Sequence, residues 1–327
     1  MKHSDLAKAA ALLVTVVLLV ILFSQINLSD VVTTLASIDP LYLVLGFLLY
    51  TCSYFFRALR FHILLNREVG LRSLFRIVCV HNMVNSILPA RTGELSYVYL
   101  LKKVDGRTTG EGIATLVVAR VFDFITITIL FIISFSLMGE VPSFAMDLIQ
   151  IAAVFMVTMV FVLFGLLYYG RSSLSLLEKI LGVLHLNRSS PGIYVLKKCE
   201  ETVECLERLG STRKNLYLEV LFVSLGVWTI MYSLNYVLIA AMGIPMDFTA
   251  VLFASTFAIF TTVLPVQGVG GFGTLEAGWT VGFVAAGLAQ DVAISSGFGY
   301  HVLLLVYIFI LGGFELLNLS VTDKINL

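Results

Sequence analysis

Long, mostly apolar runs recur along the chain and predict membrane-spanning helices. A transmembrane helix needs about 20 predominantly apolar residues. Six runs approach or exceed this length and occupy residues 5–24, 41–65, 113–138, 148–170, 216–242 and 292–319. The first run follows a lysine-containing segment, as in a signal peptide, but no small-residue cleavage site comes after it. We therefore interpret it as a retained N-terminal helix.

Two further apolar stretches, 74–101 and 250–288, are each interrupted near the middle by a Leu-Pro pair. Proline in a helix interior breaks the helix. Basic residues flank the first stretch at both ends and acidic residues flank the second, so each stretch leaves and returns on one side of the membrane. Broken helices at membrane depth are tolerated where their backbone is buried in protein or lines a cavity. We predict two re-entrant helical hairpins.

Lysine and arginine residues outside the apolar runs gather on one side of the predicted helices. They cluster in 67–76, in 102–107 and in the long loop 171–215, whereas the opposite connections carry acidic residues. Because basic loops face the cytoplasm, we expect a multi-pass protein of the cell membrane with both termini cytoplasmic. Apolar residues at helical spacing in the 171–215 loop predict an amphipathic helix that lies on the membrane or on the bundle.

The predicted elements fall into two halves, 41–138 and 216–319, that share the same order. Each half is a span, a hairpin broken at Leu-Pro and a second span, and the charges give the halves opposite orientations. In secondary transporters such an inverted repeat places the binding site near the bilayer midplane. We predict an all-α integral membrane protein, a single membrane domain over 1–327. It has six transmembrane helices and two re-entrant hairpins in an inverted repeat.

The composition agrees with this architecture. Hydrophobic residues make up 59% of the 327 residues and charged residues 13%, and the mean hydropathy is +0.97. A soluble domain carries about 25% charged residues, so this chain has too few polar side chains to cover a water-facing surface. Positive and negative residues number 21 each, which gives no reason to expect a nucleic-acid partner. The four cysteines form no C-x-x-C pair, and we expect no disulfide.

Five charged residues stand deep in the predicted membrane segments: Arg91, Glu94, Arg120, Asp123 and Glu276. A charge at that depth costs about 2.5–3.5 kcal/mol on insertion scales, so each is a candidate for function. Arg91 lies in the first break, where its planar guanidinium would suit a phosphate; the alternative is that it pairs with Glu94 or Asp123 to close the fold. Arg120 and Asp123 share one helix face. They either line a polar cavity or only hold helices together.

The second break contains four glycines in six residues, Gly268, Gly270, Gly271 and Gly273. They form a G-x-G-x-x-G string, but a dinucleotide site requires a βαβ unit, and an apolar membrane helix precedes this one. Glycines let a backbone approach a ligand closely, although a tight turn alone would account for one or two of them. The further candidates at the two breaks are Gln267, Thr274 and Glu276, with Asn82, Asn85, Pro89, Gly93 and Pro265 as secondary ones.

Three strings carry these candidates: NSILPARTGE at 85–94, RVFD at 120–123 and LPVQGVGGFGTLE at 264–276. Together they resemble the flippase-like domain family, which shares its membrane domain with the lysylphosphatidylglycerol synthases. The resemblance covers about residues 5–320 and implies a domain that moves a lipid between leaflets. The chain has no room for the soluble aminoacyl-transferase domain of full synthases or for a fused glycosyltransferase domain. Synthesis of a modified lipid is therefore not expected.

Three functions are compatible with these features. We favour translocation of an anionic phospholipid or a polyprenyl-phosphate-linked lipid between leaflets, with Arg91, Arg120 and the glycine break holding the head group. The second is a membrane-embedded lipid transferase with Glu94, Asp123 or Glu276 as general base. Against it, the membrane segments contain no H-x-x-x-H pair or clustered carboxylates, so we expect neither metal nor cofactor. The third is a non-catalytic partner of a separately encoded lipid-modifying or glycosyl transferase.

Overall fold

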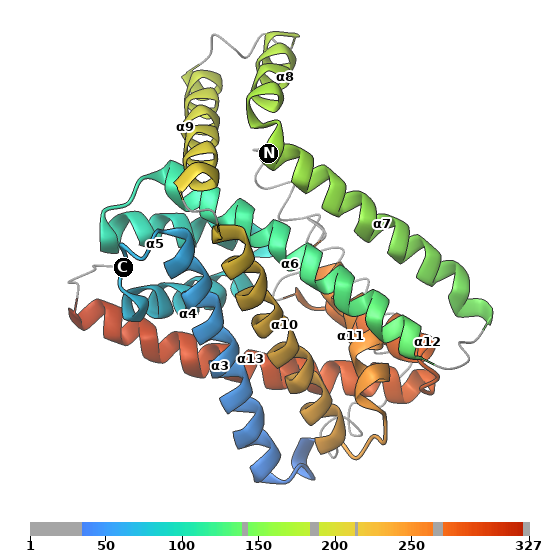
Figure 1. Ribbon diagram of the computed structural model, residues 1–327. Helices are drawn as coiled ribbons and strands as arrows, with labels where there is room; N and C mark the ends of the chain where they lie inside the picture. Colours follow the sequence, from blue (N-terminus) through green and yellow to red (C-terminus); the bar gives the residue numbers. More distant parts are fainter. Residues whose placement is uncertain (1–34, 139–142, 184–189, 213–214, 264–270, 323–327) are drawn as a thin grey trace, which may run out of the picture.

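A computed structural model describes residues 35–138, 143–183, 190–212, 215–263 and 271–322. Within these ranges every regular element is a helix, which confirms the predicted all-α architecture (Figure 1). In chain order the helices are α3 (Pro40–Leu64), α4 (Leu71–Ile87), η1 (Pro89–Glu94), α5 (Leu95–Asp105), α6 (Thr109–Leu137), α7 (Ser143–Tyr168), α8 (Gly170–Val183), α9 (Ser190–Thr212), α10 (Leu216–Ala241), α11 (Phe248–Val263), α12 (Thr274–Ala285) and α13 (Gln290–Thr322).

Four of the described helices, α3, α6, α10 and α13, are long and apolar enough to cross a membrane. They coincide with four of the six predicted spans. The predicted helix at 148–170 falls in α7, whose described apolar segment is Ile149–Val162. The predicted N-terminal helix at 5–24 lies outside the described residues. The structure thus contains four helices of spanning length and shorter apolar helices beside them.

Capping residues explain where the spans of the first half begin. Asp39 accepts a hydrogen bond from the backbone N–H of Leu41 at 2.8 Å, and Pro40 occupies the first turn of α3. At the start of α6, Thr108 and Glu111 form a capping box, in which each side chain accepts from the other residue's backbone N–H. The sequence therefore fixes both starts locally.

The helices on either side of both predicted Leu-Pro breaks are described. In the first, α4 ends at Ile87 and the short 3-10 helix η1 joins it to α5. In the second, α11 precedes the break and α12 follows it, while Leu264 to Gly270 lie outside the described residues. The arms of the second hairpin pack tightly, since a Cβ added at Gly282 would lie 2.0 Å from the carbonyl oxygen of Ala254. Glycine is thus required where α12 meets α11.

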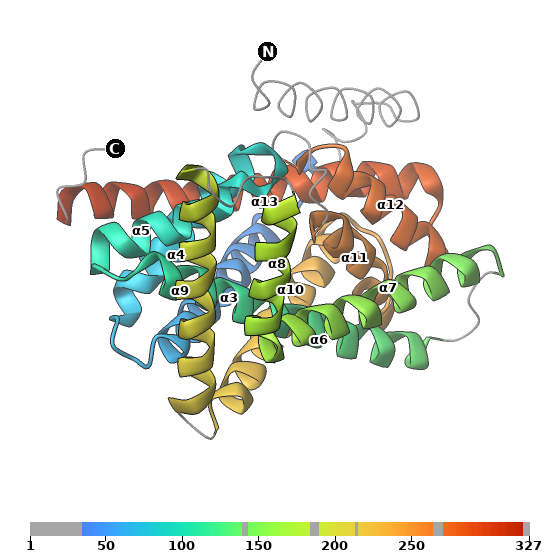
Figure 2. The same ribbon diagram turned by 90° about the horizontal axis from the view of Figure 1, so that it is seen from above.

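The two halves pack against each other through corresponding helices. Helix α3 runs beside α10, α4 packs against α13, and α11 packs against α6 (Figures 1 and 2). Small residues bring the first pair close, because a Cβ at Gly226 would lie 2.6 Å from the ring of Phe56. In each half the first helix of the hairpin, α4 or α11, thus packs on the last long helix of the other half, α13 or α6.

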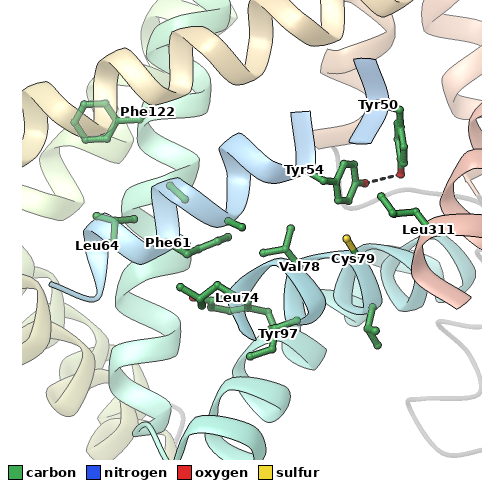
Figure 3. Close-up of a cluster of buried hydrophobic side chains, with 14 of the residues drawn as sticks. Tyr50, Tyr54, Phe61, Leu64, Leu74, Val78, Cys79, Tyr97, Phe122 and Leu311 are labelled. Atoms are coloured by element: carbon green, nitrogen blue, oxygen red, sulfur yellow. Dashed lines mark hydrogen bonds between the residues drawn. The ribbon is translucent and has the colours of Figure 1, made fainter. Parts of the chain in front are cut away.

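A continuous apolar core joins the helices of the two halves. Figure 3 shows the side chains of α3, α4, α5, α6 and α13 that meet there. The ring of Phe61 stacks on that of Tyr97 with centroids 4.4 Å apart, so α3 and α5 are held together. Tyr50 and Tyr54 carry the core toward a polar region, where their hydroxyls are 2.7 Å apart.

The predicted amphipathic loop at 171–215 contains two helices, α9 and all but the first residue of α8. They pack against each other, and α9 also packs against α6. Gly110 of α6 makes the second contact possible, since a Cβ there would lie 3.0 Å from the carbonyl oxygen of Glu201. Both helices project from one end of the bundle (Figure 1).

Candidate functional site

A cavity of about 260 Å³ lies between the two halves. Its walls come from α3, α4 and α6 of the first half and from α10, α11, α12 and α13 of the second. The charged side chains that line it are Arg57, Arg60 and Arg120, and neither aspartate nor glutamate is among its described lining residues. Both helix breaks reach it, through Asn85 and Ser86 before the first break and Gly271 and Thr274 after the second.

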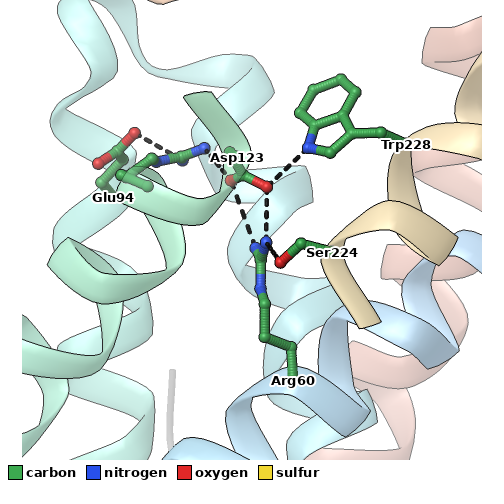
Figure 4. A network of polar contacts seen from close by, with 6 residues as sticks. Arg60, Glu94, Asp123, Ser224 and Trp228 are labelled. Atoms are coloured by element: carbon green, nitrogen blue, oxygen red, sulfur yellow. Dashed lines mark hydrogen bonds and ion pairs between the residues drawn. The ribbon is translucent and has the colours of Figure 1, made fainter. Parts of the chain in front are cut away.

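Asp123 is the centre of a buried polar network beside this cavity (Figure 4). Its side chain, on α6, makes two hydrogen bonds with Arg60 of α3, at 2.6 and 3.3 Å. Trp228 of α10 donates its indole N–H to the same carboxylate at 2.8 Å, and Ser224 of α10 accepts from Arg60 at 3.1 Å. Arg60 is 2% exposed and Asp123 3%. These hydrogen bonds pair the two charges and tie three helices together, while the Nε atom of Arg60 makes no hydrogen bond in the described structure.

Arg120 extends this network to the first break. It donates to Glu94 of η1 at 2.8 Å and to Asp123 at 3.5 Å, so it links η1 to the centre of the network. Its Nε atom is buried without a hydrogen-bond partner in the described structure. Arg120 and Asp123, which share one helix face, are in contact, but at 3.5 Å this is the longer of the two ion pairs that Arg120 makes in the described structure.

Arg57 contacts aromatic rings and lacks a carboxylate partner. Its guanidinium carbon is 5.7 Å from the ring centroid of Tyr54 and 5.5 Å from that of Trp228, which is within cation–π range. No carboxylate in the described part of the chain forms an ion pair with it, and its Nε atom is buried without a hydrogen-bond partner. Arg57 is therefore a cation of the cavity wall with unused hydrogen-bonding capacity.

Glu276 caps the helix that follows the second break. One carboxylate oxygen accepts from the backbone N–H of Gly273 at 2.8 Å, and the other lies 2.6 Å from Nδ1 of His301. Glu276 is completely buried, whereas His301 lines the cavity and packs against Phe272. Gly271 and Gly273 have φ angles of 76° and 84°, which favour glycine. Glu276 therefore contacts the cavity-lining His301 and holds the backbone N–H of Gly273 at the start of α12.

The structure brings together many of the residues predicted from sequence. Five of them line the cavity: Asn82, Asn85, Arg120, Gly271 and Thr274. Five do not line it: Gly93, Glu94 and Asp123 beside the first break and on α6, and Gly273 and Glu276 at the start of α12. Outside the described part are the side chains of Pro89 and Arg91 and the whole of Pro265, Gln267, Gly268 and Gly270.

Sequence reasoning missed Arg57, Arg60 and Trp228. The two arginines lie within the predicted span 41–65. Arg57 comes seven residues before the end of α3, so it lies about 10 Å from that end along the helix axis. The criterion that selected Arg120, a charge inside an apolar run, would have found both. Trp228 carries no such signal, because an apolar context gives no indication that its indole N–H has a carboxylate partner. In the described residues, no group of three His, Cys, Asp or Glu side chains could hold a metal ion.

The helices of spanning length, with a charged cavity between them, identify a helical multi-pass membrane protein. The chain belongs to the family described as the lysylphosphatidylglycerol synthase TM region, whose model matches residues 8–312. This confirms the resemblance seen in the sequence motifs.

Two relatives illustrate the family. The chain is 27% identical to Glycosyltransferase AglD of Haloferax volcanii over 311 residues, which is 85% of this chain and 48% of that protein. It is 26% identical to a UPF0104 membrane protein of Methanothermobacter thermautotrophicus over 286 residues, which is 82% of this chain and 80% of that protein. The chain thus spans about half the length of the glycosyltransferase and most of the length of the second relative.

Proposed function

We propose that this protein moves an anionic lipid, a phospholipid or a polyprenyl-phosphate-linked lipid, between the leaflets of the membrane. The observation that carries the proposal is the cavity between the two halves, whose charged lining is cationic. The carboxylates of Asp123 and Glu94 pair with Arg60 and Arg120, which leaves the positive charge of Arg57 without an ion-pair partner among the described residues. An anionic head group would neutralise it, while the lipid tails remain in the bilayer between the helices.

The arrangement in the membrane is part of this proposal. We propose six transmembrane helices, with 5–24 and α7 completing the four long spans, and two re-entrant hairpins, with both termini cytoplasmic. The packing supports an inverted repeat, because exchanging the halves converts the contact of α4 with α13 into that of α11 with α6. The contact of α3 with α10 maps onto itself. Such a repeat puts a central cavity within reach of both leaflets.

The topology is tested by labelling single cysteines with a membrane-impermeant maleimide in intact cells and in inverted vesicles. Cysteines placed at the ends of the first hairpin, Gly70 and Asp105, should label from the cytoplasmic side. Cysteines placed at the ends of the second, Asp247 and Gln290, should label from outside. If the two ends of either hairpin label from opposite sides, that hairpin crosses the membrane and the inverted repeat is wrong.

Transport is tested in liposomes that contain the purified protein and a trace of acyl-labelled fluorescent phosphatidylglycerol or of a fluorescent polyprenyl phosphate. A reductant added outside bleaches only the outer leaflet, so continued bleaching reports translocation. Protein-containing liposomes should bleach further than empty ones. Failure of every anionic lipid to exceed empty liposomes, with the protein shown to be folded, contradicts the proposal.

A pair of matched variants tests whether the cavity is the route. Ser86 is half-buried and lines the cavity, and its hydroxyl donates to the carbonyl of Met83 at 2.8 Å. Ser136 is exposed on α6 and donates to Ile132 at 2.8 Å. Ser86→Trp should fill the cavity and slow translocation strongly, whereas Ser136→Trp should leave the rate unchanged. Equal rates in the two variants would remove the cavity from the mechanism.

The relative named as a glycosyltransferase favours one second candidate, a transferase that acts on a lipid carrier. The described carboxylates support transport better, because Asp123, Glu94 and Glu276 are each already engaged by Arg60, Arg120 and His301. A carboxylate held by a cation is a weak general base. Incubation of the reconstituted protein with a polyprenyl phosphate and a radiolabelled sugar nucleotide decides the matter, since a labelled lipid would establish transferase activity.

A further inference from the structure

A buried carboxylate–imidazole pair lies behind the second break. One carboxylate oxygen of Glu276 on α12 lies 2.6 Å from Nδ1 of His301 on α13, and the other accepts from the backbone N–H of Gly273 at 2.8 Å. Glu276 is 0% exposed, and His301 is 3% exposed but lines the cavity. Because Glu276 is enclosed, a proton that enters from the cavity meets the pair at His301.

The hydrogen bond to Glu276 fixes which nitrogen of His301 exchanges that proton. A carboxylate accepts, so we assign a hydrogen to Nδ1, which donates it to Glu276. The other nitrogen, Nε2, lies on the side of the second break, because a Cβ added at Gly271 would be 3.8 Å from it. Gly271 also lines the cavity. A proton bound at Nε2 therefore puts a positive charge beside the negative charge of Glu276.

The other histidine of the described cavity wall, His81 on α4, has a neutral hydroxyl as its hydrogen-bond partner. Its Nδ1 lies 3.0 Å from the hydroxyl of Ser96 on α5, which in turn donates to the carbonyl of Gly93. A neutral hydroxyl stabilises a positive imidazole less than a carboxylate does. Of the two histidines, His301 is thus the one whose partner favours the bound proton.

The other titratable groups that face the pair keep their charge while His301 changes. Apart from the two histidines, those of the described cavity wall are Tyr50, Tyr54, Arg57 and Arg60 on α3, Arg120 on α6 and Tyr300 on α13. Helices α10 and α11 add none to the described wall. Arg60 and Arg120 are paired with the carboxylates of α6 and η1, and an arginine stays charged. The charge that varies at this wall is therefore that of the second-break pair.

We propose that the Glu276–His301 pair binds a coupling proton that is taken up together with the anionic lipid. Without a proton on Nε2 the pair carries one negative charge, which repels an anion in the cavity, and one proton neutralises the pair. Each ligand thus raises the affinity for the other by the same factor. The proton binds Nε2 from the cavity and returns to water when the lipid leaves, and no bond of the lipid changes. This inference rests on the proposed translocation function and names its coupling ion.

The test measures proton uptake on binding, by titration calorimetry of the purified full chain in detergent, in buffers of different ionisation enthalpy. The probes are dihexanoyl phosphatidylglycerol and farnesyl phosphoglucose. Both are phosphodiesters that keep one negative charge from pH 5 to 8, the range in which histidine ordinarily titrates, so the protein must bind any proton taken up. Coupling of about fivefold or more should weaken binding by that factor from pH 5 to pH 8. At the midpoint it should give uptake of at least about 0.4 proton per ligand.

Two variants of the pair should change the affinity in opposite directions. His301→Gln leaves the charge of Glu276 unneutralised, so binding should be weak at both pH values and proton uptake should vanish. Glu276→Gln removes the repelling charge, so at pH 8 the probes should bind about fivefold or more tightly than to the wild type. A pair with only a structural role would lose affinity in both variants, and that result overturns the inference.

Two other histidines serve as matched controls. His62→Gln removes an imidazole in the last turn of α3, where Nδ1 lies 2.7 Å from the carbonyl oxygen of Val69. His81→Gln removes the other histidine of the described cavity wall. Both variants should keep the proton uptake of the wild type. Loss of uptake in His81→Gln with uptake retained in His301→Gln would place the proton elsewhere and overturn the inference.

A pH gradient across the liposomes separates this inference from the translocation function. The wild type should move the fluorescent lipid faster from the acidic to the alkaline side than in the reverse direction, and His301→Gln should show no such bias. Translocation without any dependence on protons overturns the coupling and leaves the function standing. Proton-linked binding without translocation supports the pair and overturns the function. Neither binding nor translocation of any anionic lipid overturns both.

Discussion

Replacing Asp123 by asparagine tests the centre of the buried network without changing the size of the side chain. Both carboxylate oxygens receive donors: Oδ1 from Arg60 and Trp228, and Oδ2 from Arg60 and Arg120. Whichever way an asparagine is turned, its NH₂ group faces a donor, and Arg60 keeps a buried charge without a counter-charge. Removing one partner of a buried pair costs about 3–5 kcal/mol. We expect Asp123→Asn to lower the free energy of unfolding by that amount.

The variant is measured by equilibrium unfolding in mixed micelles of a mild detergent and dodecyl sulfate. A second variant, Trp228→Phe, removes one charge-assisted hydrogen bond, and we expect a loss of about 1.5–3 kcal/mol. The double variant Arg60→Met/Asp123→Leu deletes both charges together. It should cost several kcal/mol less than the sum of its two single variants, because no unpaired charge remains. Unfolding of Asp123→Asn within about 1 kcal/mol of the wild type would refute the reasoning.

Two further predictions concern the second hairpin. Gly282→Ala should destabilise the protein by about 3 kcal/mol, because its Cβ meets the Ala254 carbonyl at 2.0 Å, whereas Gly313→Ala, with nothing within 4 Å, should be neutral or slightly stabilising. Similar unfolding free energies for the two variants would show that the hairpin arms can separate freely. Glu276→Gln should cost about 2 kcal/mol, and Glu111→Gln, in the exposed capping box of α6, less than about 1 kcal/mol. Equal losses would mean that burial adds nothing to the Glu276 cap.

The sequence predicted the elements of this fold better than it predicted the site. Apolar length locates α3, α6, α10 and α13, and the first Leu-Pro pair locates the end of α4, because these signals act within a few residues. Spacing along one helix placed Arg120 and Asp123 on the same face, where they lie 3.5 Å apart. It could not show that Asp123 binds Arg60 more closely, since these residues are 63 positions apart and only the packing of α3 on α6 joins them. Similarly, Glu276 and His301 meet only because α12 packs on α13.

The charged residues at the cavity divide into those that hold the helices together and those left to act on a ligand. Asp123, Arg60 and Glu94 are tied to partners on other elements, so their replacement should appear first as lost stability. Arg57 has ring contacts but no carboxylate partner in the described structure, so its replacement should appear first as lost binding. A cavity that binds anionic head groups needs both kinds of residue. The paired charges keep the wall polar and hold the helices in place, and a cation without an ion-pair partner attracts the ligand. Stability and binding measured on the same variants therefore separate the two roles, which a transport assay alone would merge.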